Sequence, residues 1–289
     1  IVVLAIFLGY LLSTALVKPF ARVTKAIEDL TDGYQNEEIS VPDYTETALI
    51  TDAFNKMLSR MKILDESRQE FVSNVSHELK TPLTSMKVLA DSLNSMEDAP
   101  IELYKEFMGD IGNEIDRETK IINDLLSLVK MDKSAADLNV TNMNINELLE
   151  QILKRLNPIA EKQNVELVLE SFRPVSADVD EVKITLAFTN LIENAIKYNH
   201  TDGNVTVSAV RMKNTVVLTV ADTGNGIEES FREQIFEPFF RIDKSRSRQL
   251  GGVGLGLALV REIVRVHDGT IEVHGNEQGG TTFEITMGL

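Results

Sequence analysis

Hydrophobic residues between positions 54 and 129 recur at helical spacing, with polar residues between them. No glycine or proline occurs between Asp43 and Thr81, so one unbroken helix is predicted there. His77 lies about 200° around this helix from both Val75 and Leu79 and therefore faces away from their apolar stripe. The sequence thus predicts a helix that buries one face and presents one imidazole to solvent. The stripe consists of Phe71, Val75, Leu79, Pro82, Met86, Leu89 and Leu93.

A second helix is predicted to run back along the first. Residues 96–100 (MEDAP) indicate a turn, and heptad-like apolar spacing resumes after it. Each helix has a whole apolar stripe that one hairpin cannot cover, so two hairpins should pair as a four-helix bundle. The sequence therefore predicts a homodimer. The second stripe consists of Tyr104, Met108, Ile111, Ile115, Ile122, Leu125 and Val129.

Residues 1–17 are almost wholly apolar and uncharged. A bilayer span needs about 20 apolar residues, so this run is expected to be the C-terminal part of a transmembrane helix. A buried core helix and a signal-peptide remnant are the alternatives. Lys18, Arg22 and Lys25 follow and favour the cytoplasm for everything downstream. The first residue is Ile, so the chain is expected to be a fragment.

Residues 18–66 are expected to form two amphipathic helices joined by a polar connector. Pro19 lies where a helix can start. Pro19 and the run ETALITDAFNKM at 46–57 resemble a HAMP signalling domain. Ala48 stands where that family usually has Gly, and a plain coiled-coil linker is the alternative.

A linker is expected at 134–143. From residue 144 onward, apolar residues follow helical spacing in some segments and the alternation of a strand in others. Asn146 is expected to cap a helix that Pro158 limits. Helices are also expected at Val179–Tyr198 and Leu255–His267. Helices followed by antiparallel-looking strands predict a two-layer α/β sandwich. The expected strands are Val165–Leu169, Val205–Val210, Val216–Val220, Thr270–Val273 and Thr282–Thr286.

Composition narrows the class of protein. The 289 residues allow two or three domains, and a net charge of −16 argues against nucleic acid as a partner. The chain has no cysteine, which excludes disulfides and thiolate metal sites. Its four histidines form no HExxH motif, so zinc is not expected.

Two segments of the C-terminal region carry amide and carboxylate groups suited to a nucleotide. Asn190 and Asn194 share one helix face, and amide oxygens suit a Mg²⁺ ion that keeps water and phosphate ligands. Asp222, Gly224 and Gly226 follow a strand. The glycines let backbone approach a ring system, and the carboxylate can accept a hydrogen bond from an exocyclic amine. This second segment is therefore predicted to bind adenine.

Two further segments are suited to phosphate. FEPFFRID, residues 236–243, leads into a basic loop in an otherwise acidic chain. GGVGLGL, residues 251–257, opens a helix whose free N–H groups can hold phosphate. No GxxxxGK[ST] motif occurs, which excludes a P-loop ATPase. The basic residues are Arg241, Lys244, Arg246 and Arg248.

The motifs together resemble those of membrane sensor histidine kinases of two-component systems. SHELKTPL, residues 76–83, is similar to their phospho-acceptor box, and NLIENAIKYN, residues 190–199, to the asparagine box of their ATP-binding domain. Gyrase-type ATPases and related chaperones share that domain. The resemblance covers nearly all of the chain from Pro19 onward. It departs at QGGTTF, residues 278–283, where the family usually has GxGTxF.

This resemblance implies a protein-histidine kinase with ATP and Mg²⁺ as cofactors. His77 is then the phospho-acceptor, Glu78 polarises or orients its ring, and Thr81 orients water for dephosphorylating the partner. A Thr81 that only hydrogen-bonds backbone is the alternative. The partner implied is the receiver domain of a response regulator, whose Asp takes the phosphoryl group. The motifs fit autophosphorylation within a subunit or between subunits.

The resemblance also implies which residues bind the nucleotide. Asn190 and Asn194 hold Mg²⁺, and the ATP contacts are Asn190, Asn194, Lys197, Tyr198, Asp222, Gly224, Gly226, Ile227, Phe239, Arg241, Arg246, Arg248, Gly252, Gly254, Leu255, Gly256, Leu257, Thr281 and Thr282.

The domain order implied is a membrane segment at 1–17, a HAMP domain at 18–66, a dimerisation and phosphotransfer hairpin at 67–133, the linker, and an ATP-binding domain at 144–289. The location implied is the bacterial cell membrane, with the HAMP and catalytic domains in the cytoplasm. Two other functions remain open: an ATP-driven conformational machine of the gyrase or chaperone type, and a non-enzymatic coiled-coil receptor.

Overall fold

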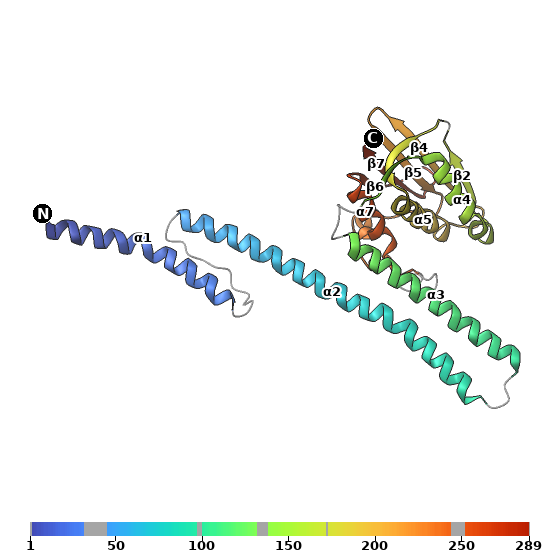
Figure 1. The fold of residues 1–289 in the computed structure, drawn as a ribbon, viewed down its shortest axis with the longest axis horizontal. Helices are drawn as coiled ribbons and strands as arrows, with labels where there is room; N and C mark the ends of the chain where they lie inside the picture. Colours follow the sequence, from blue (N-terminus) through green and yellow to red (C-terminus); the bar gives the residue numbers. More distant parts are fainter. Residues whose placement is uncertain are drawn as a thin grey trace. The chain divides into compact units, whose positions relative to one another are not determined.

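The computed structural model describes residues 2–31, 45–96, 100–131, 138–171, 173–243 and 252–288. Its contacts divide the chain into two units, Ile1–Ser73 and Asn74–Leu289 (Figure 1). Part of the predicted phosphate site lies outside the described residues, namely Lys244, Arg246, Arg248 and Gly251.

The first unit contains helix α1, Val2–Thr31, and the beginning of helix α2, Thr45–Ser95. The helix start predicted at Pro19 is wrong, because α1 continues through that position. Leu and Ala, frequent before the proline, favour helix strongly enough to extend it past one lost hydrogen bond. No helix in the part of the chain that the structure describes is long and apolar enough to cross a membrane.

The second unit begins with a helical hairpin. Helix α2 is unbroken from Thr45 through Thr81, as the lack of glycine and proline there predicts, and it continues through Pro82 to Ser95. Helix α3 spans Ile101–Met131, and residues 97–99 of the turn predicted before it lie outside the described residues. The apolar stripe from Phe71 to Leu93 is buried or half-buried, whereas His77 is exposed. The predicted orientation of the imidazole is therefore confirmed.

The rest of the second unit is an α/β domain. Its main sheet has the strand order β2-β4-β5-β7-β6, and a small sheet pairs β1 with β3. Neighbouring strands are antiparallel except β2 and β4, which are parallel, so the expectation of antiparallel strands is wrong for that pair. The strands are β1 Val140–Asn144, β2 Glu166–Glu170, β3 Ser176–Asp180, β4 Asn204–Met212, β5 Thr215–Asp222, β6 Thr270–Gly275 and β7 Thr281–Gly288.

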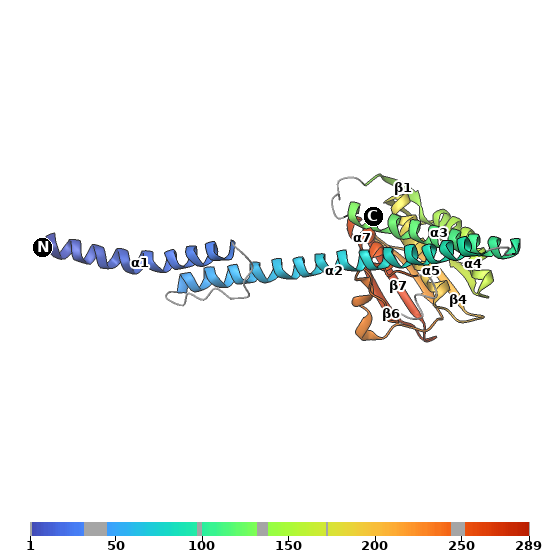
Figure 2. The ribbon, with the colours of Figure 1, turned by 90° about the horizontal axis from the view of Figure 1, so that it is seen from below.

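Three helices cover one face of this sheet: α4, Ile145–Lys162; α5, Glu181–Lys197; and α7, Gly256–Val266 (Figures 1 and 2). Burial alternates along β4, β5 and β7, because every second side chain faces the helices. The predicted two-layer α/β sandwich is therefore confirmed. Its core includes Phe188, Leu191, Ile192, Val207, Leu218, Leu259, Ile263 and Ile285.

The start of this domain differs from the sequence prediction. Strand β1 occupies part of the expected linker and ends at Asn144, whose side chain accepts a hydrogen bond from the Asn146 N–H and caps α4. The prediction that Asn146 is the cap is wrong. Asn146 Oδ1 accepts instead from the Val175 N–H, at 2.8 Å. Helix α4 also continues through Pro158, which is exposed, so water can reach the carbonyl that lacks a donor.

The predicted helix at Val179–Tyr198 starts later than expected. Val179 and Asp180 belong to β3, where they pair with Thr141 and Val140. The Asp180 side chain then caps α5 by accepting from the Lys183 N–H at 3.1 Å.

Replacing Phe188 with Ala should lower the free energy of unfolding by about 3–5 kcal/mol, because this fully buried ring leaves a cavity that its neighbours cannot fill. Urea unfolding of the full chain, followed by circular dichroism, measures the loss. Val182→Ala on the same helix is the control, since Val182 is 77% exposed and should change stability by less than about 0.5 kcal/mol. Equal effects of the two changes would contradict this description of the core.

Candidate active site

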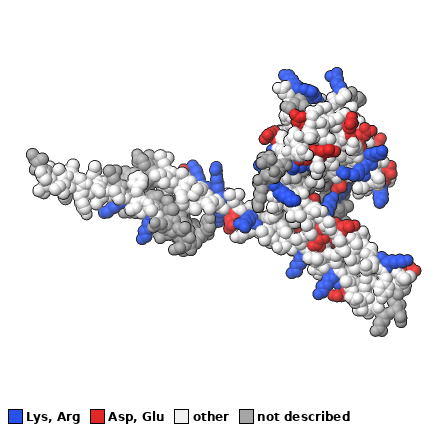
Figure 3. Space-filling model, viewed as in Figure 1, with Lys and Arg blue, Asp and Glu red and all other residues white. Residues whose placement is uncertain are grey.

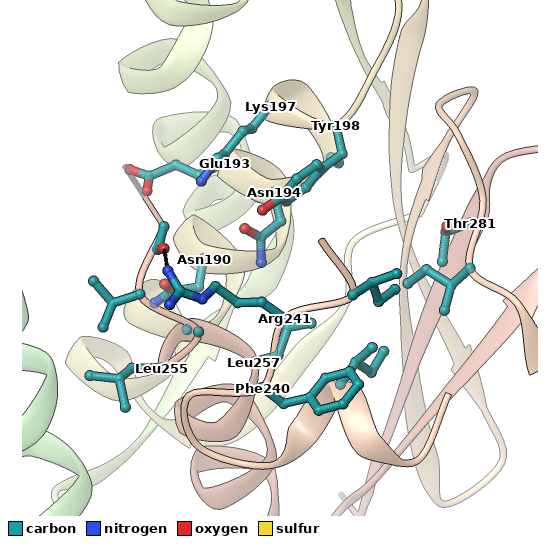
Figure 4. Close-up of a pocket in the computed structure, with 18 of the residues that line it drawn as sticks. Asn190, Glu193, Asn194, Lys197, Tyr198, Phe240, Arg241, Leu255, Leu257 and Thr281 are labelled. Carbon is teal, nitrogen blue, oxygen red and sulfur yellow. Dashed lines mark hydrogen bonds between the residues drawn. The ribbon is translucent and has the colours of Figure 1, made fainter. Parts of the chain in front are cut away.

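A cavity of about 440 Å³ opens where α5, the start of α7 and the ends of β5 and β7 meet α3 (Figure 4). Most residues predicted to bind nucleotide line it. These are Asn190, Asn194, Lys197, Tyr198, Asp222, Gly226, Ile227, Arg241, Gly252, Gly254, Leu255, Gly256, Leu257 and Thr281.

Asp222 provides a buried carboxylate at the sheet side of this cavity. It lies at the end of β5, and its Oδ1 accepts hydrogen bonds from the N–H groups of Gly224, at 2.8 Å, and Thr281, at 3.2 Å. Burial raises the pKa of Asp222, and these two hydrogen bonds oppose the shift. The carboxylate is thus held in one orientation at a cavity wall.

Two glycines allow the backbone to close around the cavity. Gly226 has φ +68°, and a Cβ there would lie 2.6 Å from the Gly279 carbonyl oxygen. Gly254 has φ +84°, and a Cβ there would lie 2.7 Å from the Phe240 carbonyl oxygen. Any other residue would strain both turns and push apart the segments that line the cavity.

Asn190 and Asn194 lie one turn apart on α5 and both line the cavity. Asn190 Nδ2 donates to the Leu186 carbonyl at 2.9 Å, which directs its Oδ1 toward the first residues of α7. A Cβ at Gly256 would lie 2.7 Å from that oxygen, so glycine is needed for this approach. The N-cap residue of α7, Leu255, makes no side-chain capping bond, so the first N–H groups of the helix are left for a ligand.

Among the described residues, four cations line the same cavity. Arg241 and Lys197 come from the α/β domain, and Arg117 and Lys120 from α3. Burial is the largest cause that lowers the pKa of Lys197 to about 8, and the positive charge of Lys120 is the next. Arg117 and Arg241 add smaller effects, while Glu193 opposes them. The cations repel one another where no anion lies between them.

Anion binding at Lys197 should therefore depend on pH. Lys197 is charged below its pKa of about 8 and neutral above it, so affinity is highest at low pH and is lost as the pH rises. If the bound anion keeps Lys197 protonated, the affinity for a nucleoside triphosphate should fall about tenfold from pH 7 to pH 9. Calorimetric titration with the non-hydrolysable analogue AMPPNP and Mg²⁺ at each pH measures this affinity. Lys197→Arg, which stays charged, should give a nearly flat profile, and the same slope in both proteins would contradict the assignment.

The predicted phospho-acceptor residues do not line the cavity but are connected to it. Glu78 Oε1 lies 2.7 Å from Arg241 Nη2, although 163 residues separate them in the chain. His77 directly precedes Glu78 and is exposed. Thr81, also exposed, donates a hydrogen bond from its hydroxyl to the His77 carbonyl at 3.1 Å.

Three predicted contacts lie off the cavity lining. Thr282 is on the opposite face of β7 from the buried Thr281, because side chains alternate along a strand. Gly224 instead donates its N–H to the Asp222 side chain. Phe239 has φ +66° and donates its N–H to the Gly254 carbonyl at 2.8 Å, so that Phe240 lines the cavity in its place.

Several lining residues were not predicted. Arg117, Lys120 and Asp124 lie on α3, where heptad spacing gives no sign of which neighbour the polar face meets. Lys120 Nζ lies 2.7 Å from Glu193 Oε2 on α5. Burial raises the pKa of Asp124. A signal was present for Glu193, which lies inside the asparagine segment NLIENAIKYN.

The site thus combines an exposed histidine on a helical hairpin with a cation-lined cavity in an α/β domain, and Glu78, the residue after the histidine, is ion-paired to Arg241 in the cavity wall. Two family models match. Residues 67–134 match the His Kinase A (phospho-acceptor) domain, and residues 179–289 match the histidine kinase-, DNA gyrase B- and HSP90-like ATPase.

Known histidine kinases are similar over much of the chain. The sensor histidine kinase WalK of Bacillus subtilis (strain 168) is 36% identical over 227 residues, which are 78% of this chain and 37% of WalK. The chain thus spans little more than a third of that relative's length. The structure of full-length ShkA in complex with AMPPNP has a TM-score of 0.58 at 26% identity, over 75% of this chain and 45% of ShkA. The histidine kinase ThkA, solved in complex with the response regulator protein TrrA, shares the fold, with a TM-score of 0.63 at 24% identity over 86% of this chain and 68% of that one.

The chain therefore contains a HisKA domain at residues 67–134 followed by a HATPase_c domain at residues 179–289, and it is similar to sensor histidine kinases.

Proposed function

We propose that this chain binds ATP in the cavity, transfers the γ-phosphoryl group to His77, and passes it to an Asp of a response-regulator receiver domain. One observation carries the proposal: Arg241, which lines the cavity, is bonded to Glu78, the residue after His77. The phosphate end of the cavity is in this way tied to the helix that presents the imidazole.

The adenine end of the bound nucleotide lies at Asp222. Its Oδ1 accepts hydrogen bonds from two backbone N–H groups. The other carboxylate oxygen, Oδ2, then accepts a hydrogen bond from the exocyclic amine of adenine. Gly226 brings the backbone close to the ring, and Ile227 and Thr281 line the same part of the wall. Gly224 acts by orienting the Asp222 side chain rather than by touching the base.

The phosphates lie between Lys197, Arg241 and the start of α7. The N–H groups at Gly256 and Leu257 and the positive end of the helix dipole favour anions there. Gly252 and Gly254 allow the backbone to approach, and Arg246 and Arg248 are proposed to complete the phosphate contacts. We expect these cations and N–H groups to supply most of the rate acceleration, because they position the phosphates and neutralise their charge.

The residues present fit a Mg²⁺ ion. The Asn190 amide nitrogen is bonded to Leu186, which leaves its oxygen on the cavity side, and Asn194 is one turn away. Hard amide oxygens suit Mg²⁺ with phosphate and water as its other ligands. When bound, the ion would neutralise negative charge on the phosphates.

His77 supplies the nucleophile. Its unprotonated ring nitrogen attacks the γ-phosphorus, a P–N bond forms, the bond to the bridging oxygen breaks, and ADP leaves. Glu78, the next residue, accepts or orients the proton on the other ring nitrogen. The phosphoryl group then moves to a receiver-domain Asp, which restores the neutral imidazole.

Thr81 is proposed to support the opposite activity, which is dephosphorylation of the partner response regulator. The Thr81 hydroxyl donates its hydrogen to the His77 carbonyl oxygen. The lone pairs of the Thr81 hydroxyl oxygen remain to accept a hydrogen bond from water. The residue is exposed one turn after His77, where a docked receiver domain could be reached.

We propose that two copies pair through the hairpins. On α3, four apolar side chains spaced seven apart remain 42–59% exposed in a single chain. A stripe of this kind is the seam of a coiled coil and is buried in a four-helix bundle. The four side chains are Met108, Ile115, Ile122 and Val129.

Membrane attachment through residues 1–17 and a HAMP domain at 18–66 complete the proposal, with the dimerisation hairpin at 67–133 and the ATP-binding domain at 144–289. The large apolar side chains between Val2 and Leu12 of α1 are exposed. The N-terminal part of this helix bears few charged residues (Figure 3). Exposed apolar surface of this extent is stable in lipid or against another protein. The positive charges after it favour the bacterial cytoplasm for the downstream domains.

The test is incubation of the full chain with γ-labelled ATP and Mg²⁺. We expect covalent label that is lost in acid and kept in base, as a P–N bond requires. The rival proposal, an ATPase machine without phosphohistidine, predicts steady release of ADP and no covalent label. Label-free turnover would therefore overturn the kinase.

A further inference from the structure

The Arg241 side chain contacts both helix α2 and the cavity. Its Nη2 lies 2.7 Å from Glu78 Oε1, and its side chain also lines the cavity proposed for nucleotide (Figure 4). The Arg241 and Glu78 side chains are only 8% and 13% exposed. An ion pair this far from water is short, directional and little screened by salt. It joins α2, directly after His77, to the wall of the cavity.

The Arg241 guanidinium has donors that the protein does not use. Nη1 donates to the Gly252 carbonyl at 3.1 Å, beside the glycine segment. Nε is buried and has no hydrogen-bond partner in the described part of the chain. A buried N–H without a partner is costly, and an anion in the cavity would satisfy it.

Glu78 and a phosphate are alternative partners for this cation. The cavity also contains Lys197, whose pKa falls partly because positive charges surround it. A triphosphate brings more negative charge than one carboxylate and relieves the repulsion among these cations. A phosphate oxygen can also accept the Nη2 hydrogen bond that now goes to the carboxylate.

We propose that Glu78 competes with a nucleotide phosphate for Arg241. Without nucleotide, Arg241 holds Glu78 away from the imidazole of His77. When a nucleoside triphosphate enters, Arg241 turns to its phosphates, and Glu78 is released to orient the His77 ring. Glu78 is in this way available to the phospho-acceptor only when a phosphoryl donor is present. The proposal rests on the proposed function, because it takes the cavity to be the nucleotide site.

The competition predicts that Glu78→Gln strengthens nucleotide binding. Without the carboxylate, Arg241 is free for phosphate, and the affinity for AMPPNP with Mg²⁺ should rise about three- to tenfold, the net range of one ordinary hydrogen bond, because the glutamine of the variant can still accept a neutral hydrogen bond from Arg241. Titration calorimetry on the full chain measures it. Glu70→Gln, an exposed Glu→Gln change earlier on α2, is the matched control and should leave the affinity unchanged.

A double-mutant cycle separates competition from a merely structural role. In an Arg241→Gln background the Glu78→Gln change should no longer raise affinity, since the shared cation is gone. Unchanged or weaker binding by Glu78→Gln, with the wild type binding normally, would overturn this inference and leave the proposed function standing. A gain that persists in the Arg241→Gln background would also overturn it. No binding by the wild-type chain would instead overturn the proposed function itself.

Discussion

Replacing His77 with Gln is expected to abolish covalent labelling from γ-labelled ATP, to below about one thousandth of the wild-type rate. Gln has a similar size and polarity but no ring nitrogen that can attack phosphorus, so the acceptor is removed without a change in helix packing. The side chain is exposed, and its loss should leave the fold intact. Nucleotide affinity should also stay within about twofold, because His77 does not line the cavity.

The control for this change is His274→Gln, a histidine on strand β6 that is likewise exposed. It should label at the wild-type rate. Persistent labelling of the His77→Gln protein would mean that another residue accepts the phosphoryl group.

Replacing Asp222 with Asn should weaken ATP binding by about tenfold to 150-fold, corresponding to roughly 1.5–3 kcal/mol for a hydrogen bond to a charged group. The Asn amide oxygen can still accept from the Gly224 and Thr281 N–H groups, so the loop should keep its shape. The other position becomes an NH₂ donor that faces the amine of adenine, and two donors cannot bond to each other. Calorimetric titration with AMPPNP and Mg²⁺ measures the loss.

Asp178→Asn is the matched control, since Asp178 lies on β3, is exposed, and bonds the Asn142 side chain at 2.7 Å. It should bind nucleotide as the wild type does. The change at Asp222 should also reduce the preference for adenine over guanine nucleotides. Equal losses for ATP and GTP would contradict adenine recognition by this carboxylate.

Local patterns predicted much of this molecule because local rules determine those parts. The unbroken helix α2 follows from the lack of glycine and proline before Pro82, and the outward position of His77 from helical geometry. The residues around Asn190, Asp222 and Gly254 meet in one cavity, as the sequence motifs predict: Asp222 ends β5, Gly254 directly precedes the N-cap residue of α7, and Asn190 lies within α5.

Contacts between distant segments could not be predicted in the same way. The strand pair β1–β3 forms between two short segments, one of which is polar and was expected to be a linker. The contribution of Arg117 and Lys120 to the cavity depends on how α3 meets the α/β domain, which heptad spacing does not encode. The same holds for the bond between Glu78 and Arg241, 163 residues apart.

The prolines show a further limit of local rules. Helices α1 and α4 continue through Pro19 and Pro158 because the loss of one hydrogen bond is small against the propensity and packing of the whole helix. For α4, the apolar face that includes Ile152 and Leu156 is buried on the sheet, and this burial outweighs the lost bond.

The most direct test of the central claim is to map the modified residue by mass spectrometry, at alkaline pH, after incubating the full chain with ATP and Mg²⁺. The phosphotransfer account predicts one phosphorylated peptide, with the phosphoryl group on His77, in the wild type and at least about tenfold less of it in the Asp222→Asn protein at low ATP. A wild-type chain that binds ATP and Mg²⁺ normally but carries phosphate elsewhere, or nowhere, would contradict it.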